Sequence, residues 1–127
     1  MNYTFDRHIA GTFNDVVERT IAALEKEGFG VLTDIDVSAT MKAKLGVEFR
    51  PYRILGACNP PLSHQALQAE DKIGAMLPCN VIVQEKANGI EVSAVDPLVG
   101  MERIGNPELS GIASEVAGKL KKVLESI

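Results

Sequence analysis

The sequence has no tryptophan, only two cysteines and few aromatic residues, which make up 5% of its 127 residues. No apolar run approaches the ~20 residues that a membrane-spanning helix needs. Positive charge is also scarce, since 13 basic residues stand against 17 acidic ones and the net charge is −4. Nucleic-acid-binding domains usually carry a basic face and stacking aromatics, and anionic membranes attract basic proteins. The composition therefore argues against nucleic-acid and membrane partners.

Motifs of common enzymes are also missing. The glycine-rich nucleotide loops and the metalloprotease and hydrolase signatures do not occur. Charged residues from Asp6 onward interrupt the start of the chain, which is not typical of a signal peptide. We therefore expect a cytoplasmic protein. The missing enzyme motifs favour a protein that is not an enzyme, although the sequence leaves that question open.

The remaining composition is that of an ordinary globular protein, with 46% apolar and 24% charged residues. The length is typical of one domain, so residues 1–127 are treated as a single domain. Tyr3 and Phe5 alternate with polar residues and predict a first strand, which Gly11 ends. Thr12 and Asp15 form a capping box that predicts a helix over about 12–27.

Four strands are predicted next, over 29–37, 50–58, 79–86 and 90–95, and Asn88-Gly89 joins the last two as a hairpin. In the 29–37 strand, Val31, Thr33, Ile35 and Val37 are expected on one face, and Leu32, Asp34 and Asp36 on the other. The 50–58 strand is almost continuously apolar, so we expect cover on both of its faces over most of its length. Short helices are predicted after Ser38, ending at Gly46, and after Asn59.

The last helix begins at Asn106-Pro107 and keeps an apolar stripe to the end of the chain, while 97–105 is expected to be a loop. The predicted fold is therefore α+β, with a mainly antiparallel five-stranded sheet in the order strand, helix, four strands, helix. A doubly wound parallel fold would need a long helix after each strand, which this sequence lacks. Both long helices are expected on one face, with these residues facing inward: Val16, Val17, Leu24, Leu109, Ile112, Val116, Leu120 and Val123. The opposite face needs cover from a partner chain or from 61–77.

Three stretches carry a resemblance to a known family: Phe29–Gly46, the Ile-Leu-Gly-Ala-Cys-Asn-Pro segment over 54–60, and Leu-Pro-Cys-Asn over 77–80. Together they resemble the bacterial and archaeal family known as domain of unknown function three hundred and two. The resemblance spans nearly the whole chain. It implies the same order of strands and helices and a tendency to form homodimers, and it supplies no catalytic residues.

Cys58 and Cys79 are the most reactive residue types in the sequence. Cys58 precedes the predicted helix at Asn59, where the helix dipole would lower the pKa of a thiol, whereas burial would raise it. The alternative is that both cysteines are buried in the core and unreactive. A ligand pocket between the sheet and 58–77 would be lined by the following residues: Tyr52, Cys58, Asn59, Pro60, His64, Cys79 and Asn80.

Basic residues gather at Lys42, Lys44, Arg50 and Arg53, with Glu48 as the one acid among them. If they converge, they form an anion-binding site, and otherwise they are a solvated face. Asp34 and Asp36 share one face of a strand and are interpreted as solvent-facing rather than as a metal or acid–base pair. We predict no metal site and cannot identify a cofactor from the sequence.

Two function hypotheses remain. The favoured one is a non-catalytic ligand-binding or interaction protein that forms a homodimer, with a small molecule as a possible ligand. The alternative is a thiol-dependent redox or soft-metal-handling protein that uses Cys58 and Cys79.

Overall fold

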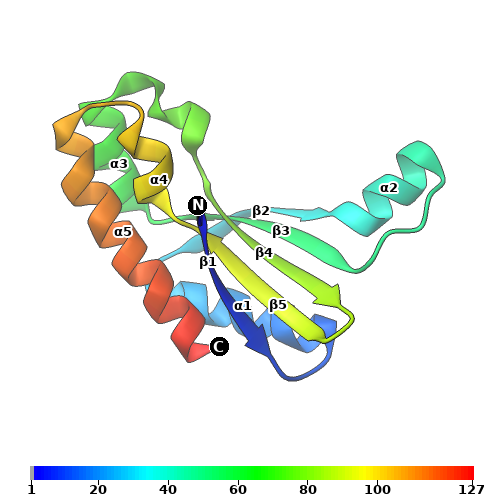
Figure 1. The fold of residues 1–127 in the computed structure, drawn as a ribbon. Helices are drawn as coiled ribbons and strands as arrows, with labels where there is room; N and C mark the ends of the chain where they lie inside the picture. The colour runs from blue at the N-terminus through cyan, green and yellow to red at the C-terminus, as the bar shows by residue number, and fades with distance from the viewer. Residues whose placement is uncertain (1) are drawn as a thin grey trace.

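The computed structural model describes residues 2–127 as one five-stranded antiparallel sheet with helices against it (Figure 1). The strands are β1 (Thr4–Ile9), β2 (Gly30–Asp36), β3 (Tyr52–Cys58), β4 (Cys79–Lys86) and β5 (Gly89–Val95). The helices are α1 (Phe13–Lys26), α2 (Val37–Leu45), α3 (Pro60–Ala69), α4 (Pro97–Glu102) and α5 (Pro107–Ser126), and η1 (Asp71–Met76) is a 3₁₀ helix. The strand order is β1-β5-β4-β3-β2, and every neighbouring pair is antiparallel. The predicted α+β class and the element order are confirmed.

The main core lies between one face of the sheet and the helices α1 and α5. Alternate strand residues such as Leu55, Val83 and Val92 are fully buried there because successive side chains point to opposite faces. The eight helix residues predicted to face inward do so; seven are buried, and Ile112 packs half-buried against the core. Within residues 2–127, no helix has both the length and the hydropathy that crossing a membrane requires.

Three helix starts follow from local sequence. Thr12, Asn59 and Asn106 each accept a hydrogen bond from a backbone N–H in the first turn of the helix that follows. A side-chain acceptor at this position satisfies an amide that would otherwise have no partner. These capping contacts explain why the starts of α1, α3 and α5 are predictable from short stretches of sequence.

Two local predictions were wrong. The cap of α2 is Asp36 and not Ser38: the Asp36 carboxylate accepts from the Ala39 N–H at 3.0 Å and from the Ser38 hydroxyl at 2.8 Å. The segment predicted as a loop over 97–105 contains α4, whose cap is Asp96. In both cases the aspartate immediately before the helix accepts a hydrogen bond from a backbone N–H of the first turn and so caps the helix.

The expected alternation along β2 is broken by a β-bulge. Val31 lies opposite Ala57 and Thr33 lies opposite Gly56, so Leu32 has no partner in the register. Val31 therefore lies on the helix side of the sheet, whereas Thr33 and the following Ile35 lie on the other side. The prediction that Val31, Thr33, Ile35 and Val37 share one face of a strand was wrong. A single inserted residue reverses the side on which the rest of the strand presents its side chains, and Val37 is the first residue of α2.

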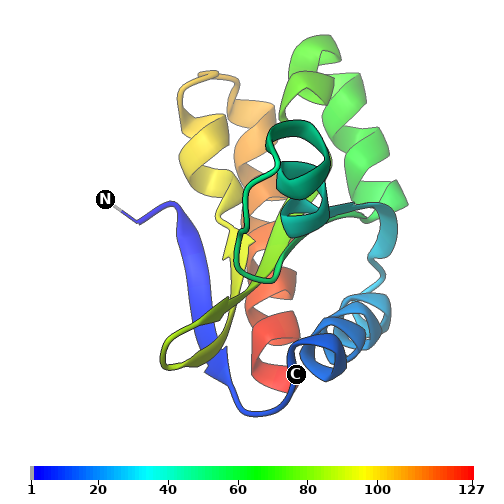
Figure 2. The same cartoon turned by 90° about the vertical axis from the view of Figure 1, so that its right-hand side faces the viewer.

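Among residues 2–127, no helix lies over the second face of the sheet. The segment 61–77 forms α3 and η1, which pack against α5 rather than across this face, so it does not supply the cover that we expected. In Figure 2, α5 lies behind the strands and α2 lies in front of them, away from the other helices. β3 has cover on both sides at Gly56, where Thr33 and Pro78 come close, but Tyr52 and Ile54 are only half-buried. The expectation of two-sided cover along most of β3 was therefore wrong.

Candidate functional site

The two thiols lie at the same end of the sheet. Cys79 is opposite Ala57 in the β3–β4 register and is buried, and Cys58 is the next residue on β3 and is half-buried. Burial raises the pKa of the Cys79 thiol to about 11, and the neighbouring Cys58 thiol adds to this rise. The Cys58 sulfur lies 3.2 Å from the Ser63 hydroxyl in the first turns of α3. Both are free thiols, and Cys58 is the more accessible of the two.

Asn59 has a structural role that occupies its whole side chain. Its Oδ1 accepts from the Leu62 N–H at 3.3 Å, and its Nδ2 donates to the Glu27 carbonyl at 3.4 Å. The first contact caps α3, and the second connects α3 to the turn between α1 and β2. Pro60 and His64 are exposed on the same helix. The structure therefore places Cys58 at the start of a capped helix, as predicted.

The space predicted to hold a ligand is small. A cavity of about 20 Å³ lies beside Asn59 and Cys79, with Phe29, Leu62 and Met101 among its walls. This is room for about one water molecule.

The predicted pocket residues also do not all meet. Tyr52 is six residues from Cys58 along β3, which is ~20 Å in an extended strand. Asn80 is exposed, outside the buried row that Cys79 joins. The structure therefore gathers the residues around the start of α3 and separates Tyr52 from them. It also places Cys79 on the helix face of the sheet, beside its partner Ala57, and Cys58 and Asn80 on the other face.

The basic residues predicted to bind an anion have separate partners. Lys42 pairs with Glu48, and the Arg53 guanidinium binds the Asp34 carboxylate through two nitrogens, one of them at 2.7 Å. Arg50 donates to Gln84 and stacks over the rings of Phe49 and Tyr52, at 4.6 and 5.5 Å from their centroids.

Most of these positive charges are thus already engaged within the chain. Lys44 is exposed. Anion binding by the four basic residues stays a prediction, and it would require some of these pairs to open.

Asp34 and Asp36 lie on one face of β2, as predicted, and each has a different partner. Asp34 pairs with Arg53, which raises the pKa of the Arg53 guanidinium. The backbone amide of Ala39 and the Ser38 hydroxyl hold the pKa of the Asp36 carboxyl below its usual value. Among residues 2–127, no group of three His, Cys, Asp or Glu side chains is arranged to hold a metal ion.

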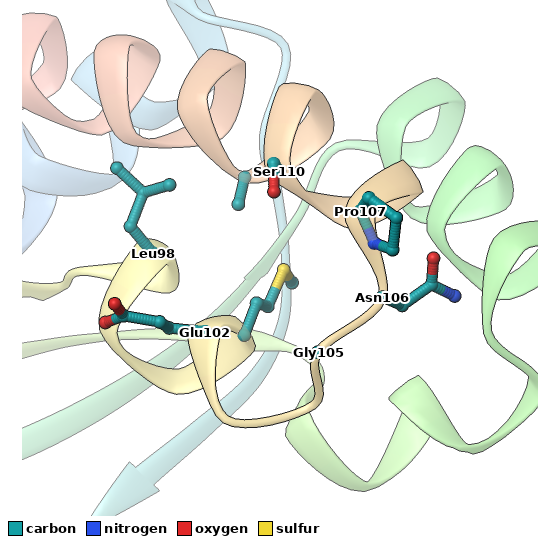
Figure 3. Close-up of a pocket in the computed structure, with 8 residues that line it drawn as sticks. Leu98, Glu102, Gly105, Asn106, Pro107 and Ser110 are labelled. Carbon is teal, nitrogen blue, oxygen red and sulfur yellow. The ribbon is translucent and has the colours of Figure 1, made fainter.

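A larger hollow lies between α4 and the first half of α5, where the sequence predicted only a loop (Figure 3). Its volume is about 590 Å³, within the size range of small-molecule sites. The walls combine apolar side chains with one carboxylate and one hydroxyl and consist of Leu98, Met101, Glu102, Gly105, Asn106, Pro107, Ser110 and Ala113. The signal that could have revealed it is Asp96-Pro97, which has the residue types of a helix start.

The second feature that the sequence reasoning missed is a projecting arm, which we define as residues 32–52. It consists of the outer part of β2, all of α2 and the loop into β3, and α2 stands clear of the other helices (Figure 1). Five of its large apolar side chains are exposed, namely Leu32, Ile35, Leu45, Val47 and Phe49. No residue of α2 is buried. The signal in the sequence was the lack of an apolar stripe on this helix, which shows that it has no face to pack on its own core.

The geometry defines a small α+β domain with one covered and one uncovered sheet face, a capped helix beside two thiols, and an apolar arm. Residues 5–127 match the family model described as Domain of unknown function DUF302, and the chain belongs to this family.

A solved structure shares the fold: the crystal structure of uncharacterized conserved protein DUF302 from Bacillus stearothermophilus. It is 26% identical, the match covers 98% of this chain and 97% of that one, and the TM-score is 0.92. The comparison with curated proteins finds no match. Family membership therefore agrees with the predicted resemblance and adds no activity to it.

Proposed function

We propose that this chain is a non-catalytic interaction domain that acts as a homodimer. The observation that carries the proposal is the uncovered apolar surface: the arm exposes Leu45 to 69% and Val47 to 45%, and no helix covers the second face of the sheet. Large apolar side chains gathered on one exposed segment are typical of an interaction site. A symmetric dimer is the most common way in which such a surface is covered.

The roles of the candidate polar and thiol residues support a binding function. Asp36 and Asn59 cap helices, Asp34 pairs with Arg53, and Cys79 is buried with a raised pKa. Each of these side chains is thus accounted for by the stability of the fold.

Sedimentation velocity at micromolar concentration tests the proposal. We expect a dimer whose affinity changes little with salt if apolar contacts dominate. A monomer under these conditions would contradict the proposal.

The hollow between α4 and α5 is the place that we propose for a small ligand, because its size and mostly apolar walls suit one. The neutral fluorescent probe N-phenyl-naphthylamine tests this. Ser110→Trp should fill the hollow and reduce probe fluorescence, whereas Lys122→Trp, at an exposed position more than three turns further along α5, should leave it unchanged. Equal probe fluorescence in both variants would exclude this hollow as the binding site.

The alternative function is thiol chemistry at Cys58, and one observation favours it. Cys58 is half-buried immediately before α3, and its sulfur lies 3.2 Å from the Ser63 hydroxyl, within hydrogen-bond distance. In this alternative Cys79 would be the second thiol of a redox pair or a soft-metal ligand. Alkylation of Cys58 in the folded protein separates the two functions.

A further inference from the structure

The hollow between α4 and α5 has an apolar floor and a polar mouth. Met101 on α4 and Ala113 on α5 are only 8% and 0% exposed, so they form its floor. Glu102 and Ser110 are exposed and lie at its mouth, one on each helix (Figure 3). In small-molecule sites a few polar groups fix the orientation of a ligand whose body is buried against apolar walls. The arrangement here suits a ligand with an apolar body and one polar head.

Few polar side chains of the hollow are available to such a head. Asn106 lines the hollow, but its Oδ1 accepts from the Glu108 N–H at 3.0 Å and its Nδ2 donates to the Ala69 carbonyl at 2.9 Å. Among the ion pairs of residues 2–127, none involves Glu102. The Glu102 carboxylate and the Ser110 hydroxyl are therefore the side-chain groups that a ligand head would meet.

The start of α5 also borders the hollow, and the positive end of a helix dipole favours anions. Its first-turn amides are already used, however. Pro107 has no N–H, and the Glu108 N–H is held by the Asn106 side chain. The Leu109 N–H donates to the Asn106 carbonyl at 3.1 Å. The walls include no lysine, arginine or histidine, so an anionic head would meet the Glu102 carboxylate with no cation to bind it.

We propose that the hollow binds an amine with an apolar body, whose protonated head pairs with Glu102 and donates a hydrogen bond to Ser110. This rests on the ligand site proposed above and names the chemical class of its ligand. The body would lie against Met101 and Ala113 at the floor, while the head stays at the exposed mouth, where its charge keeps contact with water. Arg103 follows Glu102 in the chain but is not among the residues that line the hollow.

Three compounds that share a naphthyl group and differ in the charge of the head test this proposal in the full chain: naphthylmethylamine, naphthylmethanol and naphthylacetate. Titration of the ¹⁵N-labelled protein, followed by NMR, gives each dissociation constant and shows which amides shift. We expect the amine to bind about tenfold more tightly than the acetate, with the alcohol between them. The amides of Met101 and Ser110 should shift, and the preference for the amine should shrink in high salt because the pair is exposed.

Two exposed glutamates provide a matched pair of variants. Glu102→Gln keeps the size of the side chain and removes its charge, so the affinities for the amine and the acetate should become nearly equal while that for the alcohol is unchanged. Glu125→Gln removes the same charge near the far end of α5, outside the hollow, and should leave all three affinities unchanged. Ser110→Trp should weaken the binding of all three compounds.

The outcomes separate the ligand class from the ligand site. Suppose that Ser110→Trp weakens all three compounds, but the amine has no advantage or keeps its advantage in Glu102→Gln. The amine class would then be overturned, and the hollow would stand as the binding site. If none of the compounds shifts the amides of Met101 and Ser110, both the class and the site are overturned.

Discussion

Gly56 lies directly beneath Thr33 of the neighbouring strand. A Cβ on Gly56 would be 2.1 Å from the Thr33 Oγ1 and 2.7 Å from Cγ of Pro78. Thr33 reaches this position because the bulge at Leu32 places it opposite Gly56 on the uncovered face of the sheet. Glycine is thus required by close packing on that face, and the contact fixes the register of the edge strand that leads into the arm.

Gly56→Ala should lower the free energy of unfolding by about 1–3 kcal/mol, because the new methyl group cannot fit without movement of β2 or of the proline. Chemical denaturation followed by circular dichroism measures the change. Gly118→Ala is the control: this exposed position in α5 has no atom within 4 Å of an added Cβ, and alanine should stabilise the helix by roughly 0.5–1 kcal/mol. A neutral Gly56→Ala would show that β2 is not held in this register.

The ion pair between Arg53 and Asp34 should contribute measurably to the pairing of β2 with β3. Its side chains are only 25% and 34% exposed, and the guanidinium binds both carboxylate oxygens. A double-mutant cycle with alanine at both positions should give a coupling energy near the upper end of the range for surface pairs, about 1 kcal/mol. The coupling should weaken in high salt because part of the pair is in contact with water.

The pair of Lys42 and Glu48 is the comparison for this cycle. Its side chains are 65% and 83% exposed, so solvent should screen nearly all of the attraction. The same cycle there should give a coupling energy close to zero. Equal couplings for the two pairs would mean that the partial burial of Arg53 and Asp34 has no effect on stability.

The stability of α2 should depend on acid through Asp36. Hydrogen bonds from the Ala39 amide and the Ser38 hydroxyl lower the pKa of the carboxyl in the folded state. A lowered folded-state pKa stabilises the helix fully above the unfolded-state value, about 4, and this stabilisation is lost as pH falls through the folded-state pKa. Amide exchange in α2 should therefore accelerate below about pH 4 relative to α5.

Two substitutions separate capping from titration at this position. Asp36→Ala should weaken α2 by about 1 kcal/mol at neutral pH, because the first-turn amides lose their acceptor. Asp36→Asn keeps an acceptor but has no carboxyl to protonate, so α2 should persist and its acid dependence should disappear. An unchanged acid dependence in the asparagine variant would assign the effect to another group.

Most of the elements that could be predicted from the sequence are determined by residues close to them in the chain. Thr12, Asn59 and Asn106 cap helices through contacts within three residues, so a short window of sequence contains the cause of each helix start. The bulge at Leu32 is different. It depends on Gly56 and Pro78, which are distant in sequence, and no pattern within β2 alone could reveal it.

The candidate site was only partly predictable, for the same reason. The position of Cys58 before a capped helix follows from its neighbours in sequence, whereas the burial of Cys79 depends on how β3, β4 and the helices meet. The exposure of the arm is also a property of the assembled fold. In the sequence, Leu45 and Phe49 do not differ from apolar residues of the core. The structure shows that both are exposed.

The two thiols should differ strongly in reactivity. Burial raises the pKa of Cys79 to about 11, so near neutral pH it is almost entirely the unreactive thiol, and it is also shielded from reagents. Cys58 is only half-buried, so reagents reach its sulfur more readily than that of Cys79. Iodoacetamide at pH 7–9, with the modified residue located by mass spectrometry, should therefore label Cys58 first and Cys79 only when the protein unfolds.

The substitutions Cys58→Ser and Cys79→Ala complete the experiment. Each variant leaves a single thiol, so each rate is assigned to one residue, and circular dichroism checks that the fold is retained. The raised pKa of Cys79 also predicts that stability is full below its unfolded-state pKa and falls as the pH rises from there toward 11, and that Cys79→Ala removes this loss. If Cys58 also stays unmodified until unfolding, both thiols are structural and the thiol-dependent alternative loses its support.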